Sequence, residues 1–113
     1  MIKIVLICFA LCRAEMIFRH GSANIPQKDK RHKGGEDAYL ASNDLVVVAD
    51  GVSMWETEFG IDSGRFSKQL VTDIKYLFEQ NPTKKMKQII KEAVEGSEEI
   101  GTTTVMAAKL VDN

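Results

Sequence analysis

Residues 36–51 read EDAYLASNDLVVVADG, and two short apolar runs within this segment predict a β-hairpin. Residues 37–42 (DAYLAS) form the first expected strand, and residues 45–49 (LVVVA) form the second. The second run is continuous and β-branched, a pattern typical of a strand that is buried on both faces. Ser42, Asn43 and Asp44 lie between the two runs, and these residue types favour a turn.

Two amphipathic helices and a strand are predicted after the hairpin. The first helix begins at Asp62 or Ser63 and ends near residue 79, with an apolar stripe formed by Phe66, Leu70, Ile74, Leu77 and Phe78. The second is capped by Asn81, has Pro82 at its first position and ends near Gly96. Its expected apolar face comprises Met86, Ile89, Ile90, Ala93 and Val94. Residues 102–111 (TTTVMAAKLV) favour a final strand.

The segment before the hairpin begins with an apolar run. Residues 4–12 (IVLICFALC) follow an early Lys and contain both cysteines, Cys8 and Cys12. Residues 1–14 fit either a secretory or targeting signal or a buried first strand, and organellar or cytoplasmic locations remain alternatives. Residues 16–25 are expected to form a strand broken at Gly21, and residues 26–35 (PQKDKRHKGG) a polar loop. The predicted order is β, ββ, α, α, β, an α+β chain.

Composition and charge exclude several classes of protein. The chain has 113 residues, 44% hydrophobic and 27% charged, as in one ordinary domain or part of one. Its formal net charge of −1 does not fit a general nucleic-acid binder. No apolar run approaches the roughly 18 residues of a stable membrane span. Residues 36–62 hold seven carboxylates and no Lys or Arg, so these charges repel one another unless solvated or matched by an external cation.

A hairpin turn centred on Asn43 would place Glu36 directly opposite Asp50. Two carboxylates about 5 Å apart destabilise a sheet unless a cation lies between them. Hard cations such as Mg²⁺ or Mn²⁺ prefer oxygen ligands, and the backbone of Gly51 can add a carbonyl. The alternative is that Asp50 and Gly51 form an ordinary turn at a strand end, and that Glu36 and Asp37 start an exposed strand.

Several short motifs occur in a recognisable order along residues 18–110. They are Gly34–Gly35–Glu36–Asp37–Ala38, Val48–Ala49–Asp50–Gly51–Val52, Trp55, Gly60–Ile61–Asp62–Ser63–Gly64, and Gly101–Thr102–Thr103–Thr104. The ordered set resembles the N-terminal part of the metal-dependent serine/threonine protein phosphatases of type 2C, and within them an organellar branch with GGEDA and ADGV motifs. The resemblance implies an α+β fold, part of a four-layer α-β-β-α sandwich, with residues 15–113 forming the N-terminal part of a phosphatase domain that we expect to be truncated.

The resemblance also implies roles for individual residues. Glu36, Asp37, Asp50 and the Gly51 carbonyl would bind metal, with two Mg or Mn ions in the complete domain. Asp50 and Glu36 would be the catalytic pair. Arg31 or Lys33 would hold phosphate. Many relatives carry an Arg shortly before the Glu-Asp pair, and some carry a His where this chain has Val52.

The function implied is hydrolysis of phosphoserine or phosphothreonine in a phosphoprotein by a water held between two metal ions. The sequence ends close to the strand that follows Gly101, so we expect this chain alone to be incomplete and weakly active or inactive. The alternative is a non-catalytic phosphatase-like binding module. The substrate phosphoprotein and the oligomeric state are not indicated by the sequence.

Overall fold

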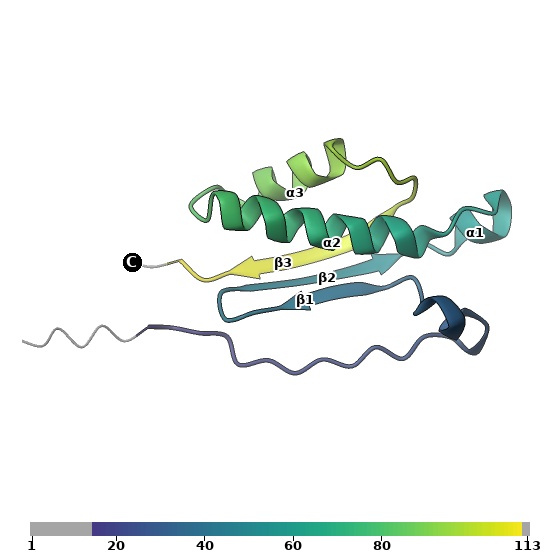
Figure 1. The fold of residues 1–113 in the computed structure, drawn as a ribbon, viewed down its shortest axis with the longest axis horizontal. Helices are drawn as coiled ribbons and strands as arrows, with labels where there is room; N and C mark the ends of the chain where they lie inside the picture. Colours follow the sequence, from purple (N-terminus) through teal and green to yellow (C-terminus); the bar gives the residue numbers. More distant parts are fainter. Residues whose placement is uncertain (1–14, 112–113) are drawn as a thin grey trace, which may run out of the picture.

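The computed structural model describes residues 15–111, and these form one antiparallel sheet covered on one face by helices (Figure 1). The predictions for residues 1–14, including Cys8 and Cys12, lie outside the described residues. The elements in chain order are η1 (Lys28–Lys33), β1 (Ala38–Ala41), β2 (Leu45–Gly51), α1 (Met54–Phe59), α2 (Ser63–Gln80), α3 (Met86–Glu95) and β3 (Thr103–Lys109). The α+β class predicted from the sequence is confirmed.

The sheet has the order β1-β2-β3, and both strand pairs are antiparallel. The predicted hairpin is present, but its register is offset by one residue, because Ala38 pairs with Ala49 and Tyr39 with Val48. The turn is therefore centred between Asn43 and Asp44. Ser42 closes this tight turn, since its backbone N–H donates to the Leu45 carbonyl at 2.9 Å. The predicted pairing of Glu36 with Asp50 is wrong for this reason.

Side chains of the sheet alternate between a buried face and an open face. The face toward the helices holds the buried residues Ala38, Leu45, Val47 and Ala49. The opposite face carries Tyr39, Val48 and Met106, which are paired across the three strands and are 47%, 56% and 74% exposed. The prediction that residues 45–49 are buried on both faces is wrong, because within the described residues the helices cover only one side of the sheet (Figure 1).

Helix α2 provides most of the helical half of the core. Asp62 is its N-cap and accepts a hydrogen bond from the Gly64 N–H at 2.9 Å, as a capping carboxylate is expected to do. The apolar stripe predicted for this helix is buried against the sheet, with Leu77 only partly so. The core cluster of buried apolar residues comprises Ala38, Leu45, Val47, Ala49, Phe66, Leu70, Val71, Ile74, Phe78, Ile89 and Ala93.

Helix α3 begins later than predicted, at Met86 with Lys85 as its N-cap. Residues 81–85 form a turn instead, and the Lys109 ammonium holds it by donating to the Pro82 and Lys84 carbonyls, both at 2.6 Å. This contact from β3 is long-range, so the local Asn-Pro signal could not reveal it. Ile89 and Ala93 are buried as expected, whereas Val94 is exposed.

Three further elements differ from the sequence-based expectation. Residues 16–25 form no strand, and Phe18 donates its N–H to the Asn43 carbonyl at 2.8 Å. The polar loop predicted for residues 26–35 contains the 3₁₀ helix η1. The short helix α1 was not predicted, because six residues are too few to show a helical period. Over residues 15–111 no helix has the length and apolar character needed to cross a membrane.

We predict that Ile74→Ala lowers the free energy of unfolding by about 2–5 kcal/mol, because it opens a cavity beneath α2. Ile74 is fully buried, whereas Tyr76 on the same helix is 60% exposed. Tyr76→Ala is therefore the matched control and should change stability by less than about 0.5 kcal/mol. Urea denaturation followed by circular dichroism measures both values, and equal losses would contradict the core described above.

Candidate functional site

The residues predicted to bind metal meet at one end of the sheet, in a cavity of about 170 Å³. This end brings together η1, the segment before β1, the end of β2 and the segment leading to α1 (Figure 1). The cavity is lined by Ile25, Pro26, Gln27, Lys30, Gly35, Glu36, Asp37, Asp50, Gly51 and Ser53. All four predicted metal ligands line it, whereas neither Arg31 nor Lys33 does.

Gly51 and Gly64 make this convergence possible through close backbone approach. A Cβ atom at Gly51 would lie 2.5 Å from the Glu36 carbonyl oxygen, which is too close for any other residue type. A Cβ atom at Gly64 would lie 2.5 Å from the Gly35 carbonyl oxygen. The first turn of α2 and the end of β2 therefore both press against the Gly35–Glu36 backbone. Gly64 thus has a packing role that its place in a helix did not reveal.

Asp37 and Asp50 face each other at the end of the hairpin. Continuing the observed register by one residue beyond Ala38 and Ala49 places Asp37 opposite Asp50 on the open face of the sheet. Partial desolvation and the neighbouring Asp50 carboxylate raise the pKa of Asp37. The like-charge repulsion predicted for this hairpin is therefore present, but Asp37 takes the place that had been predicted for Glu36.

Glu36 points the other way, toward the helices, and is buried. Its Oε1 accepts from the Ser63 hydroxyl at 3.0 Å, and its Oε2 accepts from the Ser53 hydroxyl at 2.6 Å. The Lys30 ammonium lies 2.8 Å from the same Oε2. Burial alone would raise the pKa of Glu36, but the hydrogen bonds from Lys30 and the two serines outweigh it and lower the pKa.

The two residues predicted to hold phosphate lie outside the cavity. Arg31 is exposed on η1. Lys33 is engaged with Glu56 of α1 and, at 3.2 Å, with Asp62 at the start of α2. Burial opposes the charge of Lys33, but the hydrogen bonds to Glu56 and Asp62 outweigh it and raise its pKa. In the described structure Lys33 therefore connects η1 to α1 and to the start of α2.

The sequence analysis missed Lys30, Ser53 and Ser63, which surround Glu36. Lys30 is one of several basic residues in the segment before the hairpin, and nothing local distinguishes it from Lys28 or Arg31. Ser63 was considered as a helix cap, a role that Asp62 takes, and as part of a motif, but not as a partner of Glu36. The signal that could have found it is its place among small residues at the start of α2, where close packing is expected.

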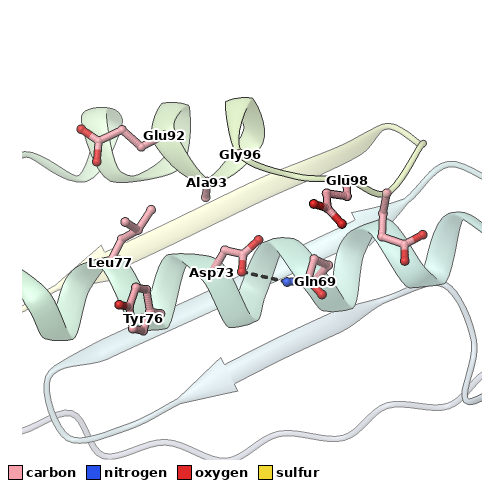
Figure 2. Close-up of a pocket in the computed structure, with 9 residues that line it drawn as sticks. Gln69, Asp73, Tyr76, Leu77, Glu92, Ala93, Gly96 and Glu98 are labelled. Carbon is pink, nitrogen blue, oxygen red and sulfur yellow. Dashed lines mark hydrogen bonds between the residues drawn. The ribbon is translucent and has the colours of Figure 1, made fainter.

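Among residues 15–111, no cluster of three or more His, Cys, Asp or Glu side chains is arranged to hold a metal ion. The predicted carboxylates share one cavity, but Glu36 is turned away from the other two. A second pocket, of about 340 Å³, lies between α2 and the end of α3 and is lined by Asp73, Tyr76, Glu92, Glu98 and Glu99, among others (Figure 2). It contains none of the predicted site residues.

The comparisons with known proteins relate this helix-covered antiparallel sheet to the protein phosphatases of type 2C. No family model matches the chain. The chain is 32% identical over 97 residues to Probable protein phosphatase 2C 71 of Oryza sativa subsp. japonica, covering 82% of this chain and 21% of the relative. It is 40% identical over 65 residues to Probable protein phosphatase 2C 55 of Arabidopsis thaliana, covering 56% of this chain and 14% of the relative.

A solved structure agrees with these relatives. The X-ray structure of the photosystem II phosphatase PBCP matches with a TM-score of 0.70 at 28% identity, covering 77% of this chain and 36% of that chain. The chain is therefore a homologue of the type 2C protein phosphatases, and it spans 14–21% of the length of the two curated relatives named above. Its assignment to the organellar branch stays a prediction.

We predict opposite effects from two neighbouring substitutions in metal-free buffer at neutral pH. Glu36→Gln should lower the free energy of unfolding by about 3 kcal/mol, because it leaves the largely sheltered Lys30 ammonium without its counter-ion. Asp37→Asn should raise it, because the raised pKa of Asp37 means that its charged form is disfavoured in the folded state.

The pH dependence checks the sign of each effect. The lowered pKa of Glu36 means that its contribution is present above its ordinary value of 4.5 and is lost as the pH falls through the lowered value. The difference between wild type and Glu36→Gln should therefore shrink in acid. The gain from Asp37→Asn should shrink as the pH falls through the raised pKa of Asp37. Urea denaturation with a chelator present measures both series, and effects of the same sign would contradict the geometry described here.

Proposed function

We propose that the protein is a metal-dependent serine/threonine protein phosphatase that hydrolyses phosphoserine or phosphothreonine in a phosphoprotein. The observation that carries the proposal is the convergence of Asp37, Asp50 and Gly51 on one cavity, in a chain homologous to type 2C phosphatases. The chain spans a minor part of the length of its curated relatives, so the activity of those relatives comes to this chain as a proposal.

The donor set fits a hard divalent cation. Partial desolvation and the neighbouring Asp50 carboxylate both raise the pKa of Asp37, and a cation such as Mg²⁺ or Mn²⁺ would relieve the repulsion between the two carboxylates. The Gly51 carbonyl is a further oxygen donor at the same place. Glu36 belongs to the site through the cavity that it lines, but the described geometry commits both of its oxygens to Lys30 and two serines.

A bound divalent ion would supply Lewis acidity, lowering the pKa of a bound water and neutralising charge on the phosphoryl oxygens. The chain's own residues would contribute position and charge. Asp50 lies at the end of the central strand β2, where two neighbouring strands restrain its backbone. The close contact between Gly51 and the Glu36 backbone holds the two acidic segments together. No covalent phosphoenzyme is required by this arrangement.

A non-catalytic phosphatase-like binding module is the second candidate. It is favoured by the open face of the sheet, where Tyr39, Val48 and Met106 form an exposed apolar row continuous with the acidic end of β2. This candidate predicts that a partner protein is retained when Asp50 is replaced, and that divalent cations do not promote phosphate release.

We predict that Asp50→Ala in the protein as its gene encodes it lowers Mn²⁺-dependent phosphate release from a phosphothreonine peptide by roughly 100-fold or more. The reason is the loss of the carboxylate best placed to hold the ion. Asp44→Ala is the matched control, because Asp44 is an exposed acid in the hairpin turn at the opposite end of β2. Its rate should stay near that of the wild type. Full activity of Asp50→Ala would refute the assignment.

A further inference from the structure

Glu36 and the Asp37–Asp50 pair lie on different sides of the hairpin. In the observed register, Ala38 and Ala49 lie on the helix-facing side of the sheet, and Tyr39 and Val48 lie on the open side. Because strand residues alternate, Asp37 belongs with Tyr39, and Glu36 belongs with Ala38. Consistent with this, Glu36 is buried and hydrogen-bonded to Ser63 of α2, whereas Asp37 and Asp50 are exposed.

Both carboxylate oxygens of Glu36 already have partners. Oε1 accepts from Ser63, and Oε2 accepts from Ser53 and lies 2.8 Å from the Lys30 ammonium. Lys30 also donates to the Ser53 hydroxyl at 3.1 Å, so ammonium, hydroxyl and carboxylate form a closed triangle. No buried side-chain nitrogen or oxygen atom of the described residues lacks a hydrogen-bond partner. Glu36 is thus fully satisfied by the protein itself.

The Lys30–Glu36 ion pair is also sheltered from solvent. Its side chains are 12% and 9% exposed, whereas those of the helical pair Lys91–Glu95 are 73% and 63% exposed. Sheltered pairs are screened little by salt and are costly to break, because the remaining charge is left without compensation. A pair on the surface of a helix contributes little by comparison. Lys30 is therefore the counter-ion that the protein itself provides for Glu36.

Lys30 lines the same cavity as Asp37, Asp50 and Gly51. We propose that Lys30 is a built-in cation that takes the place of a divalent ion at Glu36, so that metal binds on the Asp37–Asp50 side and reaches Glu36 only by displacing Lys30. This inference rests on the proposed metal-dependent function and concerns the regulation of that same site. Lys30 is a positioning residue, since it acts through Glu36.

Two physical effects follow from a resident ammonium at this place. Its positive charge would repel a divalent cation that Asp37 and Asp50 held in the same cavity. It also neutralises Glu36, whose carboxylate lines the same cavity and, without Lys30, would be a further hard oxygen donor there. Replacing Lys30 by an uncharged side chain of similar length removes both effects, so metal affinity should rise.

The test is calorimetric titration of Mn²⁺ into the full chain and its variants. Lys30→Met should bind Mn²⁺ at least tenfold more tightly than the wild type. Lys28→Met is the matched control, because Lys28 is an exposed lysine on the same helix η1, and its affinity should stay within twofold of the wild type. The double variant Lys30→Met/Glu36→Gln should lose the gain, since the released carboxylate is the added ligand.

Thermal unfolding provides a second readout that does not depend on activity. Lys30→Met should melt below the wild type in chelator and should gain more from Mn²⁺ than the wild type does, because the ion replaces the missing ammonium. If Lys30→Met fails to fold with Mn²⁺ present, Lys30→Gln, which keeps a donor for Glu36, takes its place with the same expected gain in affinity. Unchanged or weaker Mn²⁺ binding by the folded variant, or a gain that survives in the double variant, overturns the proposal.

These outcomes are separable from the test of the phosphatase activity. Full activity of Asp50→Ala would refute the proposed function without changing the comparison between Lys30→Met and Lys28→Met. Conversely, loss of activity in Asp50→Ala together with equal Mn²⁺ affinities for the wild type and Lys30→Met would leave the function in place and remove the role given to Lys30.

Discussion

The pairing of Ala38 with Ala49 and of Tyr39 with Val48 sets the direction in which every side chain of the β1–β2 hairpin points. A slip of one residue would expose the buried side chains of Ala38, Val47 and Ala49 to solvent. Their burial against α2 therefore stabilises the observed register. The same register places Asp37 with Asp50 on the open face and Glu36 on the helix side. Core packing thus decides which carboxylates of the acidic segment face each other.

A second constraint joins the elements around this hairpin. Glu36 receives hydrogen bonds from Ser53, just before α1, and from Ser63 at the start of α2, and its counter-ion Lys30 comes from η1. Three other segments, one from η1, one before α1 and one at the start of α2, are therefore bound to one buried carboxylate. Because a buried charge is costly without partners, each of these segments is held in place by the same requirement. The acidic cavity is formed by this arrangement.

Much of the fold follows from local signals, and the failures have identifiable causes. Helix α2 was predicted within one residue of its end because its apolar stripe and its Asp62 cap agree. The start of α3 was missed because Lys109, from the last strand, holds residues 81–85 in a turn. The residues of the candidate site were predicted from the order of the motifs. Their mutual arrangement was predicted wrongly, because the observed turn is centred half a residue beyond Asn43, which shifts the strand pairing by one residue.

The sequence by itself determined the α+β class, the hairpin, the two long helices and the acidic segment of residues 36–62. These features follow from hydrophobic periodicity, turn residues and the order of the motifs, all of which can be read along the sequence without knowledge of long-range contacts. Only the tertiary structure decided that Asp37 faces Asp50, that Glu36 turns inward, and that Lys30 rather than Arg31 or Lys33 enters the cavity. The physical reason is that register and charge pairing are settled by burial against distant elements, and no local pattern records which of several similar residues will be buried.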